Sequence, residues 1–393
     1  MTVTRRRRRP AVLASGIGLI AFALVAAGCS SSGSSSASGT SSSTAPTTSA
    51  STTAQVSDAA RAAAAFETLP THINVTTPLA KQPTPGTSAM YLHDQTPADQ
   101  LAGQSACAAL ESVKWTCGDI GYNSADPASY QAAVRLALQK GAKYLMDDGE
   151  PPSLLGTSVL SQICADHAHL VAASVYPDET SGCVNTVANG GPSRTNFAKA
   201  LADWFIADSD GKGDALVETV SAYPVLYWFA TQFVQFVKAD CSGCKATIMP
   251  FTGADLANGT IIPSLVSAVR ANRSYNYLIF DYAAFSDGIS SALSAAGITN
   301  VKVAGTGLDA DALAQLKAGT NAAWVAQSWF QEGYIMADVS LRLETGSSGI
   351  DESAVTPMEL ITTKNTGDVS GAGNEWNGPS DALALFQKLW NVG

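Results

Sequence analysis

The sequence has little charge, few histidines and only one long apolar run. Charged residues make up 14% of its 393 residues, four residues are histidine, and 46% are hydrophobic. This balance excludes a disordered polyelectrolyte and a charge-rich coiled coil. Residues 11–27 form the one apolar stretch that approaches the length of a membrane span, so a polytopic membrane protein is excluded as well. The rest of the chain is long enough for two domains of ordinary size.

Basic residues are also scarce once the first 28 residues are set aside. The formal net charge of the chain is −10, and residues 5–9 are five of its 23 basic residues. No acidic residue precedes Cys29, so the chain from Cys29 onward carries 18 basic and 33 acidic residues, a net charge of −15. Such a surface repels phosphate backbones, and we therefore expect no nucleic-acid partner.

The motifs of several enzyme classes are missing. The sequence contains no GxSxG elbow and no HExxH motif, and the glycine turn at 211–213 lacks the Gly-Lys-Ser/Thr of a phosphate-binding loop. We expect no catalytic activity, no metal site and no cofactor. One catalytic alternative remains, a hydrolase that works with carboxylates alone, using Asp147, Asp148 or Asp281.

The N-terminus has the layout of an export signal. A basic run at 5–9 is followed by the apolar stretch 11–27 and then by Cys29. The five residues Val-Ala-Ala-Gly-Cys that end at Cys29 resemble the bacterial lipobox, although Ala26 stands where leucine is commonest. The resemblance implies that residues 1–28 are a lipoprotein signal peptide and that Cys29 is acylated. An ordinary secretory signal with an incidental cysteine is the alternative.

Two segments of low complexity follow Cys29. Residues 29–55 are dominated by serine, threonine and alanine and predict a flexible tether, because they bury too little apolar surface to fold. Residues 56–87 predict an arm with one short helix and several proline-punctuated extended segments. At the other end of the chain, Trp376 and Trp390 are expected to pack the C-terminal tail onto the protein.

Six further cysteines lie in the region beyond the arm. An even number in an exported chain predicts disulfides, and their spacing favours three local pairs: Cys107–Cys117, Cys164–Cys183 and Cys241–Cys244. Other connectivities remain open at this stage. The last pair is a CxxC motif, but a helix pattern precedes it and a strand pattern follows, which is opposite to the order of thioredoxin-type motifs. We interpret it as a structural clip.

Strand and helix patterns alternate from residue 89 onward. Apolar runs of strand length lie at 89–93, 142–146, 170–175, 215–220, 246–249, 277–280, 301–305, 322–327 and 359–363, and 114–122 is extended. Helix patterns lie at 98–113, 127–140, 154–167, 196–207, 226–238, 261–271 and 287–296. This alternation predicts βαβ units and parallel sheets covered on both faces. A Gly/Pro break at 189–192 divides it into two α/β domains.

Several segments carry a resemblance to a known family. They are Asp-Pro-Ala-Ser-Tyr-Gln-Ala-Ala-Val-Arg-Leu-Ala-Leu-Gln-Lys-Gly-Ala-Lys-Tyr-Leu-Met at 126–146, Tyr-Leu-Ile-Phe-Asp-Tyr-Ala-Ala-Phe-Ser-Asp-Gly at 277–288, Val-Ala-Gly-Thr-Gly at 303–307, Ala-Gln-Ser-Trp-Phe-Gln-Glu-Gly at 326–333 and Leu-Ile-Thr-Thr-Lys-Asn at 360–365. With them, residues 89–364 resemble the type I periplasmic-binding proteins, the ribose- and galactose-binding receptors of ABC importers.

The resemblance implies a particular architecture. It consists of two Rossmann-like three-layer α/β/α domains with parallel sheets, joined by a hinge that the chain crosses several times. We expect domain 1 to comprise 88–188 and 328–360, and domain 2 to comprise 189–327 and 361–393.

Ligands of open α/β sheets bind at the carboxyl ends of the strands, so the residues after each predicted strand are the candidate site. In the first domain these are His93, Asp94, Gln95, Tyr122, Asp148 and Tyr176. In the second domain they are Ser221, Tyr223, Asp281, Tyr282 and Thr306. Gln327 and Trp329 are placed at the hinge by the resemblance.

The sequence also departs from the family at this site. No cleft arginine is evident in the second domain, and Asp281-Tyr282 stands where the family often has Asn-Asp. Fewer such polar groups and more aromatic rings predict a ligand that is sugar-like or partly aromatic, with fewer hydroxyls than a pentose or hexose. The implied function is a monomeric, lipid-anchored solute-binding protein on the extracytoplasmic face of the cell membrane. It would deliver a small molecule to an ABC permease. A surface sensor that presents the bound solute to a signalling partner is the alternative.

Overall fold

A computed structural model of the chain describes residues 47–371 and 375–391, all within the unit from Pro46 to Gly393. The predicted signal peptide at 1–28, the predicted lipidation site Cys29 and residues 30–46 of the predicted tether lie outside the described residues.

The prediction of a tether is wrong for residues 47–55, which form the first half of helix α1 (Thr47–Phe66). The alanine-rich part of this helix is its second half, residues 59–65, and alanine has the highest helix propensity, so the helix continues from there back into the serine- and threonine-rich residues 47–55. Ala59 and Ala63 are buried in one cluster with residues of helix α5 (Gly191–Asp208). Their small side chains let α1 lie close against α5, so tertiary packing extends the helix beyond the predicted arm.

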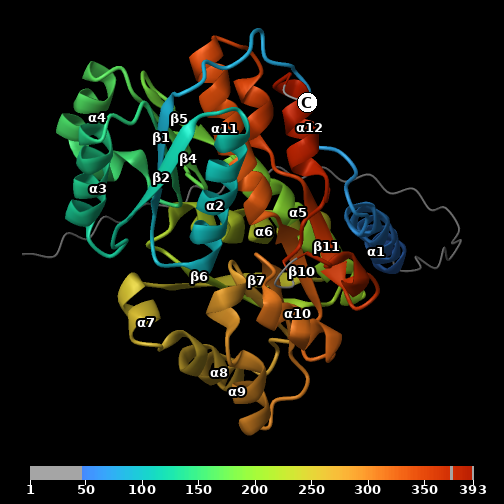
Figure 1. Cartoon of the computed structure of the whole chain (residues 1–393). Coiled ribbons are helices and arrows are strands. Elements are labelled where there is room, and N and C mark those ends of the chain that lie inside the picture. The colour runs from blue at the N-terminus through green and yellow to red at the C-terminus, as the bar shows by residue number, and fades with distance from the viewer. Residues whose placement is uncertain (1–46, 372–374, 392–393) are drawn as a thin grey trace, which may run out of the picture. The chain divides into compact units, whose positions relative to one another are not determined.

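The first sheet is entirely parallel, with strand order β2-β1-β3-β4-β5. Its strands are β1 (Ser88–His93), β2 (Thr116–Gly121), β3 (Tyr144–Asp148), β4 (His169–Ala173) and β5 (Val184–Val187). Its helices are α2 (Pro97–Ser112), α3 (Pro127–Gln139), α4 (Gly156–Ala165) and α11 (Trp329–Thr345). We call this part the first lobe (Figure 1).

Alternation along β1 explains how both faces of this sheet are covered. Ala89 and Tyr91 are buried in one cluster with residues of α2 and α11, whereas Met90 and Leu92 are buried in another with residues of α3 and α4. Successive side chains of a strand point to opposite faces, so a run of apolar residues needs a helix layer on each side.

The second sheet has the order β11-β10-β9-β8-β6-β7 and is parallel except for the β10–β11 pair. Its strands are β6 (Asp214–Val220), β7 (Lys245–Phe251), β8 (Tyr277–Phe280), β9 (Lys302–Thr306), β10 (Ala323–Gln327) and β11 (Met358–Thr362). Helices α1, α5 and α6 (Pro224–Asp240) share one apolar cluster with it. The other cluster includes residues of α7 (Gly253–Ala257), α8 (Ile261–Ala271), α9 (Ile289–Ala295) and α10 (Ala310–Lys317). This is the second lobe.

The predicted class, two α/β sheets with helices on both faces, is confirmed, and the predicted strands match the observed ones closely. The sequence pattern missed β5 and α11, and also the shorter helices α7, α10 and α12 (Ala382–Leu389). Strand β5 has only four residues, Val-Asn-Thr-Val, too few to show a period. Helix α11 is buried almost all around, from Ile335 to Leu341, and therefore lacks the polar face that marks a helix in a sequence.

The lobes are joined by three chain crossings that converge on Asn189. The crossings lie between β5 and α5, between β10 and α11, and between α11 and β11. The side chain of Asn189 donates to the Glu332 carboxylate of α11 and accepts from Thr356 Oγ1 at 2.5 Å. One buried amide thereby connects all three crossings. A Cβ on the next residue, Gly190, would lie 2.8 Å from the Val175 carbonyl oxygen, so this close approach requires glycine.

The C-terminal domain boundaries were predicted wrongly. Strand β11 begins at Met358 and belongs to the second lobe, although residues 328–360 were assigned to the first domain. Residues 361–393 were assigned to the second domain, yet α12 (Ala382–Leu389) lies in the apolar cluster of the first lobe. The reason is the apolar stripe of α12, which needs a partner and finds it on α11.

The N-terminal arm also spans both lobes. Helix α1 packs on the second lobe, whereas Ile73, Val75 and Leu79 are buried in the core of the first. The arm and the tail meet the first lobe together, because the Leu79 N–H donates to the Leu389 carbonyl at 2.8 Å.

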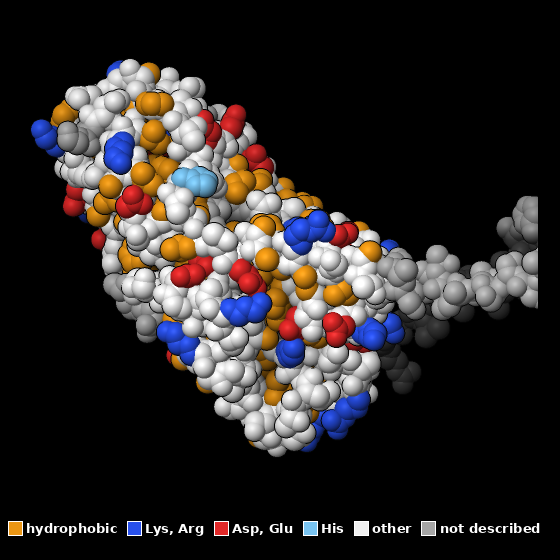
Figure 2. Space-filling view, turned by 90° about the vertical axis from the view of Figure 1, so that its right-hand side faces the viewer, with side chains coloured by type: hydrophobic (Ala, Val, Ile, Leu, Met, Phe, Trp, Pro, Cys, Tyr) orange, Lys and Arg blue, Asp and Glu red, His pale blue; other side chains and the backbone are white. Residues whose placement is uncertain are grey.

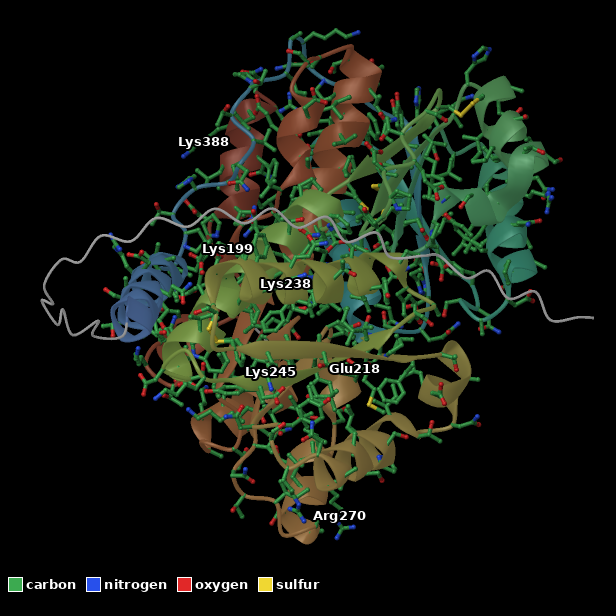
Figure 3. The ribbon with its side chains drawn as sticks, turned by 180° about the vertical axis from the view of Figure 1, so that it is seen from behind. Lys199, Glu218, Lys238, Lys245, Arg270 and Lys388 are labelled. Carbon is green, nitrogen blue, oxygen red and sulfur yellow. A yellow bond between two sulfur atoms is a disulfide. The ribbon has the colours of Figure 1, made fainter. Side chains whose placement is uncertain are left out.

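Helix α1 leaves a polar hollow of about 430 Å³ over the α5–α6 layer. Lys199 of α5 lies in it, paired with Asp203 and 3.5 Å from the carboxylate of Asp240 on α6. Figure 3 labels two lysines of this layer, Lys199 on α5 and Lys238 near the end of α6. On the face drawn in Figure 2, Lys and Arg side chains are interspersed with Asp and Glu rather than gathered in one patch.

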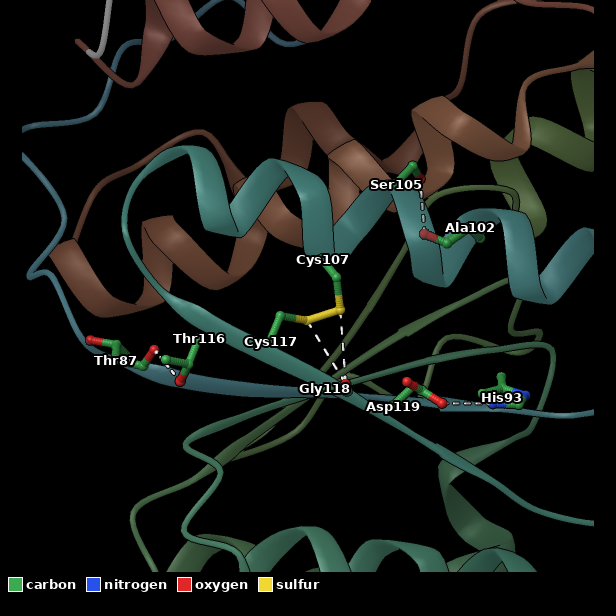
Figure 4. The surroundings of a disulfide bond; sticks show 9 residues. All are labelled: Thr87, His93, Ala102, Ser105, Cys107, Thr116, Cys117, Gly118 and Asp119. Atoms are coloured by element: carbon green, nitrogen blue, oxygen red, sulfur yellow. Dashed lines mark hydrogen bonds and ion pairs between the residues drawn. A yellow bond between two sulfur atoms is a disulfide. The ribbon is translucent and has the colours of Figure 1, made fainter. Parts of the chain in front are cut away.

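The three predicted disulfides are all present, between Cys107 and Cys117, between Cys164 and Cys183, and between Cys241 and Cys244. The first joins α2 to the edge strand β2 (Figure 4). The CxxC pair lies between the end of α6 and the start of β7, and Cys241 is only 2% exposed. This position agrees with the interpretation as a structural clip.

Truncating Trp390 should destabilise the protein strongly. Its side chain is fully buried, and its Nε1 donates to Asp338 Oδ1 at 2.7 Å; Asp338 in turn pairs with the buried Arg342. We expect Trp390→Ala to lower the free energy of unfolding by about 3–5 kcal/mol, measured by urea denaturation. The control is Leu136→Ala at a 42% exposed position, which should change it by less than about 1 kcal/mol. Equal effects of the two variants would show that the tail is not part of the core.

Candidate binding cleft

A cavity of about 200 Å³ lies at the carboxyl ends of both sheets. Asp94 follows β1, Asp148 ends β3, and Ser174 follows β4. The second lobe contributes residues after β6 and β8, and Trp329 begins α11. The complete lining is Asp94, Thr96, Ala98, Asp99, Asp148, Gly149, Ser174, Arg194, Tyr223, Val225, Leu226, Leu256, Tyr282, Phe285 and Trp329.

Five of the predicted site residues line this cavity: Asp94, Asp148, Tyr223 and Tyr282 from strand ends, and Trp329 from the expected hinge. The positions of the first four follow from topology, because parallel strands of one sheet end at the same edge. The two sheets present these edges to one cavity, so the cleft has walls from both lobes.

His93 was predicted in the cleft but lies in a different hollow. The larger cavity of about 520 Å³ is bounded by α2 and β2 and also lined by Asp119, Glu111 and the Cys107–Cys117 disulfide. His93 Nε2 lies 3.4 Å from Asp119 Oδ2 there (Figure 4). The last residue of β1 points to the α2 side of the sheet edge, away from the second lobe, which strand position alone does not show.

Four other predicted residues form structural hydrogen bonds outside the cavity lining. The Gln95 side chain donates to the Tyr122 carbonyl, and the Tyr122 hydroxyl donates to Asp147 Oδ1 at 2.9 Å. Ser221 Oγ donates to the Phe251 carbonyl, and Thr306 Oγ1 donates to the Asp281 carbonyl. These residues hold the strand ends in place.

Tyr176 lies at the hinge instead of in the cleft. It lines a neighbouring hollow of about 160 Å³ together with Gly190 and Gly191. Its ring stacks on Trp228 with a centroid distance of 4.4 Å. Ser174, two residues earlier, takes the place in the cleft that was predicted for Tyr176.

Asp281 and Gln327 are buried behind the cleft. The Asp281 carboxylate accepts from the Val220 N–H at 3.2 Å and lies beside the carboxyl group of Glu218 on β6 (Figure 3). Burial raises the pKa of Asp281 to about 6 and raises that of Glu218 well above its ordinary value. Both side-chain amide atoms of Gln327 are buried without a hydrogen-bond partner among the described residues.

Arg194 is the functional residue that the sequence analysis missed, and the expectation that the second domain lacks a cleft arginine is wrong. Arg194 lies in the first turn of α5, is 3% exposed and lines the cavity. Its Nε donates to the Asn189 carbonyl at 3.2 Å, whereas Nη1 has no hydrogen-bond partner among the described residues. A cleft arginine was expected only in the aromatic stretch after Tyr223, which contains none. The available signal was a lone arginine directly after the Gly-Gly-Pro hinge.

Buried carboxyl groups dominate the cleft on the first-lobe side. Asp99 is 2% exposed and accepts from the Tyr91 hydroxyl at 2.7 Å and from the Asp94 N–H at 2.6 Å. Burial, with the nearby Asp148, raises the pKa of Asp99 to about 9. Burial also raises the pKa of Glu150, just after β3, to about 7, and that of Glu332 well above its ordinary value.

Aromatic rings form the second-lobe wall. Tyr282 and Phe285 meet edge to face at 5.3 Å, Tyr223 stacks on Phe285 at 6.4 Å, and Tyr282 meets Trp329 edge to face at 6.2 Å. The rings pack against one another, and such ring pairs stabilise the wall that they form. The cleft therefore pairs an acidic wall with an aromatic wall, and one buried guanidinium lies between them.

No protein-family model matches the chain, and no curated protein sequence matches it. Solved structures do. The chain is similar to a periplasmic ribose ABC transporter protein from Conexibacter woesei, with 21% identity and a TM-score of 0.62 over 75% of this chain and 98% of that one. It is also similar to the 5-methylthioribose transporter solute-binding protein from Thermotoga lettingae, with 14% identity and a TM-score of 0.63 over 80% and 100%.

A third similar structure is an ABC transporter solute-binding protein from Burkholderia graminis in complex with D-arabinose. It has 13% identity and a TM-score of 0.61 over 74% of this chain and 100% of that one. These likenesses confirm the fold that the sequence resembles, the type I periplasmic-binding fold. The neighbours are transport proteins rather than enzymes.

Within the part of the chain that the structure describes, no three His, Cys, Asp or Glu side chains are grouped to hold a metal ion. In the same residues, none of the helices is long and apolar enough to cross a membrane.

The buried carboxyl groups predict an unusual pH dependence of stability. Asp281, Glu150 and Asp99 have folded-state pKa values of about 6, 7 and 9, above their values of roughly 4 in an unfolded chain. The folded state therefore binds more protons, and its stability is highest at low pH and falls as the pH rises through these values. Carboxylates with lowered pKa values, such as Glu352 with a pKa of about 2, change the stability with pH only below roughly pH 4.5.

We expect the melting temperature of the ligand-free protein to fall between pH 5 and pH 8. In Glu150→Gln this fall should be smaller, because the glutamine is neutral throughout the range. Differential scanning calorimetry at constant ionic strength measures both. A melting temperature that rises over this range in the parent protein would contradict the raised pKa values of the buried carboxyl groups.

Proposed function

We propose that this protein is a lipid-anchored, extracytoplasmic solute-binding protein that captures a small molecule between its two lobes and delivers it to an ABC permease. The observation that carries the proposal is the cavity with polar and aromatic side chains from both lobes. A ligand that touches Asp148 on one side and Arg194 and Tyr282 on the other stabilises the closed arrangement of the lobes over an open one.

The hinge supports this mechanism. Arg194 lies next to Asn189, the residue that connects the three crossings, and donates to its carbonyl. A solute that binds Arg194 therefore acts directly on the segment about which the lobes move. The solute-binding proteins to which the fold is similar are named as parts of ABC transporters, which favours a permease as the partner.

An extracytoplasmic site of action is supported by the disulfides. Three cysteine pairs in one chain are typical of an oxidising compartment. Cys29 would carry the lipid, and a single folded copy on the membrane would be sufficient for delivery. We infer no catalytic step, because closure around the solute is the whole function.

Ligand binding should depend on residues of both lobes. We expect a sugar or polyol that binds the cleft, when present at a concentration of about 100 times its Kd, to stabilise the parent protein by about 2.7 kcal/mol in thermal-shift measurements. Trp329→Ala and Arg194→Ala should each abolish most of this shift, because each removes a side chain that lines the cleft. Leu136→Ala at an exposed position is the control and should keep it. If both cleft variants keep the full shift, the solute binds elsewhere.

The lipid anchor gives a separate prediction. Cys29→Ser should move the protein from the membrane fraction to the soluble extracytoplasmic fraction, measured by fractionation and immunoblotting. Ser30→Ala is the matched control and should stay with the membrane. Membrane retention of the Cys29 variant would show that anchoring does not use this residue.

A further inference from the structure

The charges that line the cleft are not balanced. Four ionisable residues line the cavity: Asp94, Asp99, Asp148 and Arg194. Two more carboxyl groups, those of Glu332 and Asp281, act on the same guanidinium from behind the lining. One buried positive charge is therefore surrounded by carboxyl groups, and buried charges in proteins are normally paired.

Some of these carboxyl groups have partners within the protein. Asp99 accepts two hydrogen bonds, and Glu332 accepts from Ser174 Oγ at 3.1 Å and from the Asn189 side chain. Asp148 lies beside the carboxyl group of Glu332, and its buried Oδ1 accepts no hydrogen bond from any other described residue. Asp94 accepts at Oδ1 from the Thr96 N–H at 2.7 Å.

The guanidinium group of Arg194 also has a nitrogen without a hydrogen-bond partner among the described residues. Arg194 is 3% exposed, lines the cavity and presents an Nη1 that lacks a partner within the described residues. Asp148 and Arg194 both line the same small cavity, and each keeps one buried polar atom, Asp148 Oδ1 and Arg194 Nη1, without a hydrogen-bond partner among the described residues. Two such groups call for a solute with a donor at one place and an oxygen acceptor at another.

Aromatic rings and cavity size narrow the choice. The rings of Tyr223, Tyr282 and Trp329 line the same space as the carboxylates, and aromatic faces attract cations as well as sugar rings. The cavity of about 200 Å³ corresponds to roughly seven water volumes, the size of one small ring or short chain.

We propose that the solute is a hydroxylated amine of about the size of an amino sugar, whose protonated amine binds at Asp148 and Asp94 and whose oxygen binds at Arg194. This inference rests on the proposed function and specifies its substrate class. The amine supplies the positive charge that the acidic wall lacks, and a neutral sugar of the same shape leaves Asp148 without an ionic partner.

Matched sugars test the charge directly. Isothermal titration calorimetry would compare D-glucosamine, D-galactosamine and D-mannosamine with their parent hexoses and with their N-acetyl derivatives, which keep the nitrogen but carry no charge. We expect at least one amine to bind at least about tenfold more tightly than both of its neutral counterparts. In Asp148→Asn the amine and its neutral counterparts should bind with about equal affinity, and in Asp94→Asn the preference for the amine should weaken.

The control for net charge is Asp166→Asn, an exposed carboxylate of the first lobe away from the cleft, which should keep the preference. Circular dichroism and melting temperature show whether each variant is folded, and Asp94→Asn serves if Asp148→Asn is not. A parent hexose that binds as tightly as its amine would overturn this inference and leave the proposed function standing. An amine preference that survives both cleft variants would overturn the assignment to Asp148 and Asp94. If no compound of the panel binds, this inference fails, whereas the proposed function is decided by the thermal-shift measurements with other sugars and polyols.

Discussion

The buried hydrogen-bond network around Asn189 is the constraint on which the rest of the structure depends. Asn189 lies in the first crossing, donates to Glu332 at the start of α11 and accepts from Thr356, which precedes β11. A buried amide or carboxyl group left without a partner is costly, so the three crossings have to meet in this arrangement. Asn189 itself has a positive φ of 45°, a conformation that asparagine tolerates better than most residues. The network thereby sets the approach of the two lobes and leaves the crossings as the places where they can move.

The cleft follows from this hinge. With the crossings gathered at one point, the carboxyl ends of both sheets face a shared cavity, and Arg194 extends from the hinge into it. The acidic wall is stable without ligand because Asp99 and Glu332 favour the protonated state when buried. The same low-dielectric surroundings strengthen any charged contact that a solute makes there. The N-terminal arm and the C-terminal tail, which both reach the first lobe, add packing around the hinge without entering the cavity.

Much of the fold could be predicted because buried parallel strands leave a clear signal in sequence. The strand Tyr277–Phe280 was predicted at its observed bounds, and the resemblance to a known fold was carried by such segments. Elements that are very short or buried on all sides were missed, as β5 and α11 show. The tail was assigned to the wrong lobe because its place was inferred from the resemblance alone, and α12 packs on the first lobe instead. Four cleft residues were found by one topological rule, whereas His93 failed it because it lies on the α2 side of the sheet, and Tyr176 failed it because β4 ends at Ala173, before the predicted end at 175.

Features that depend on neighbours along the chain could be predicted from the amino-acid sequence. They are the order of most strands and helices, the shortage of basic residues and the favoured cysteine pairs, each of which joins residues at most 19 positions apart. Features that depend on contacts between distant segments arise only when the chain folds. Asn189 and Glu332 are 143 residues apart, and no local pattern connects them. The place of Arg194 in the cleft and the burial of Asp99 and of Asp148 Oδ1 are of the same kind, because burial is a property of the packed molecule.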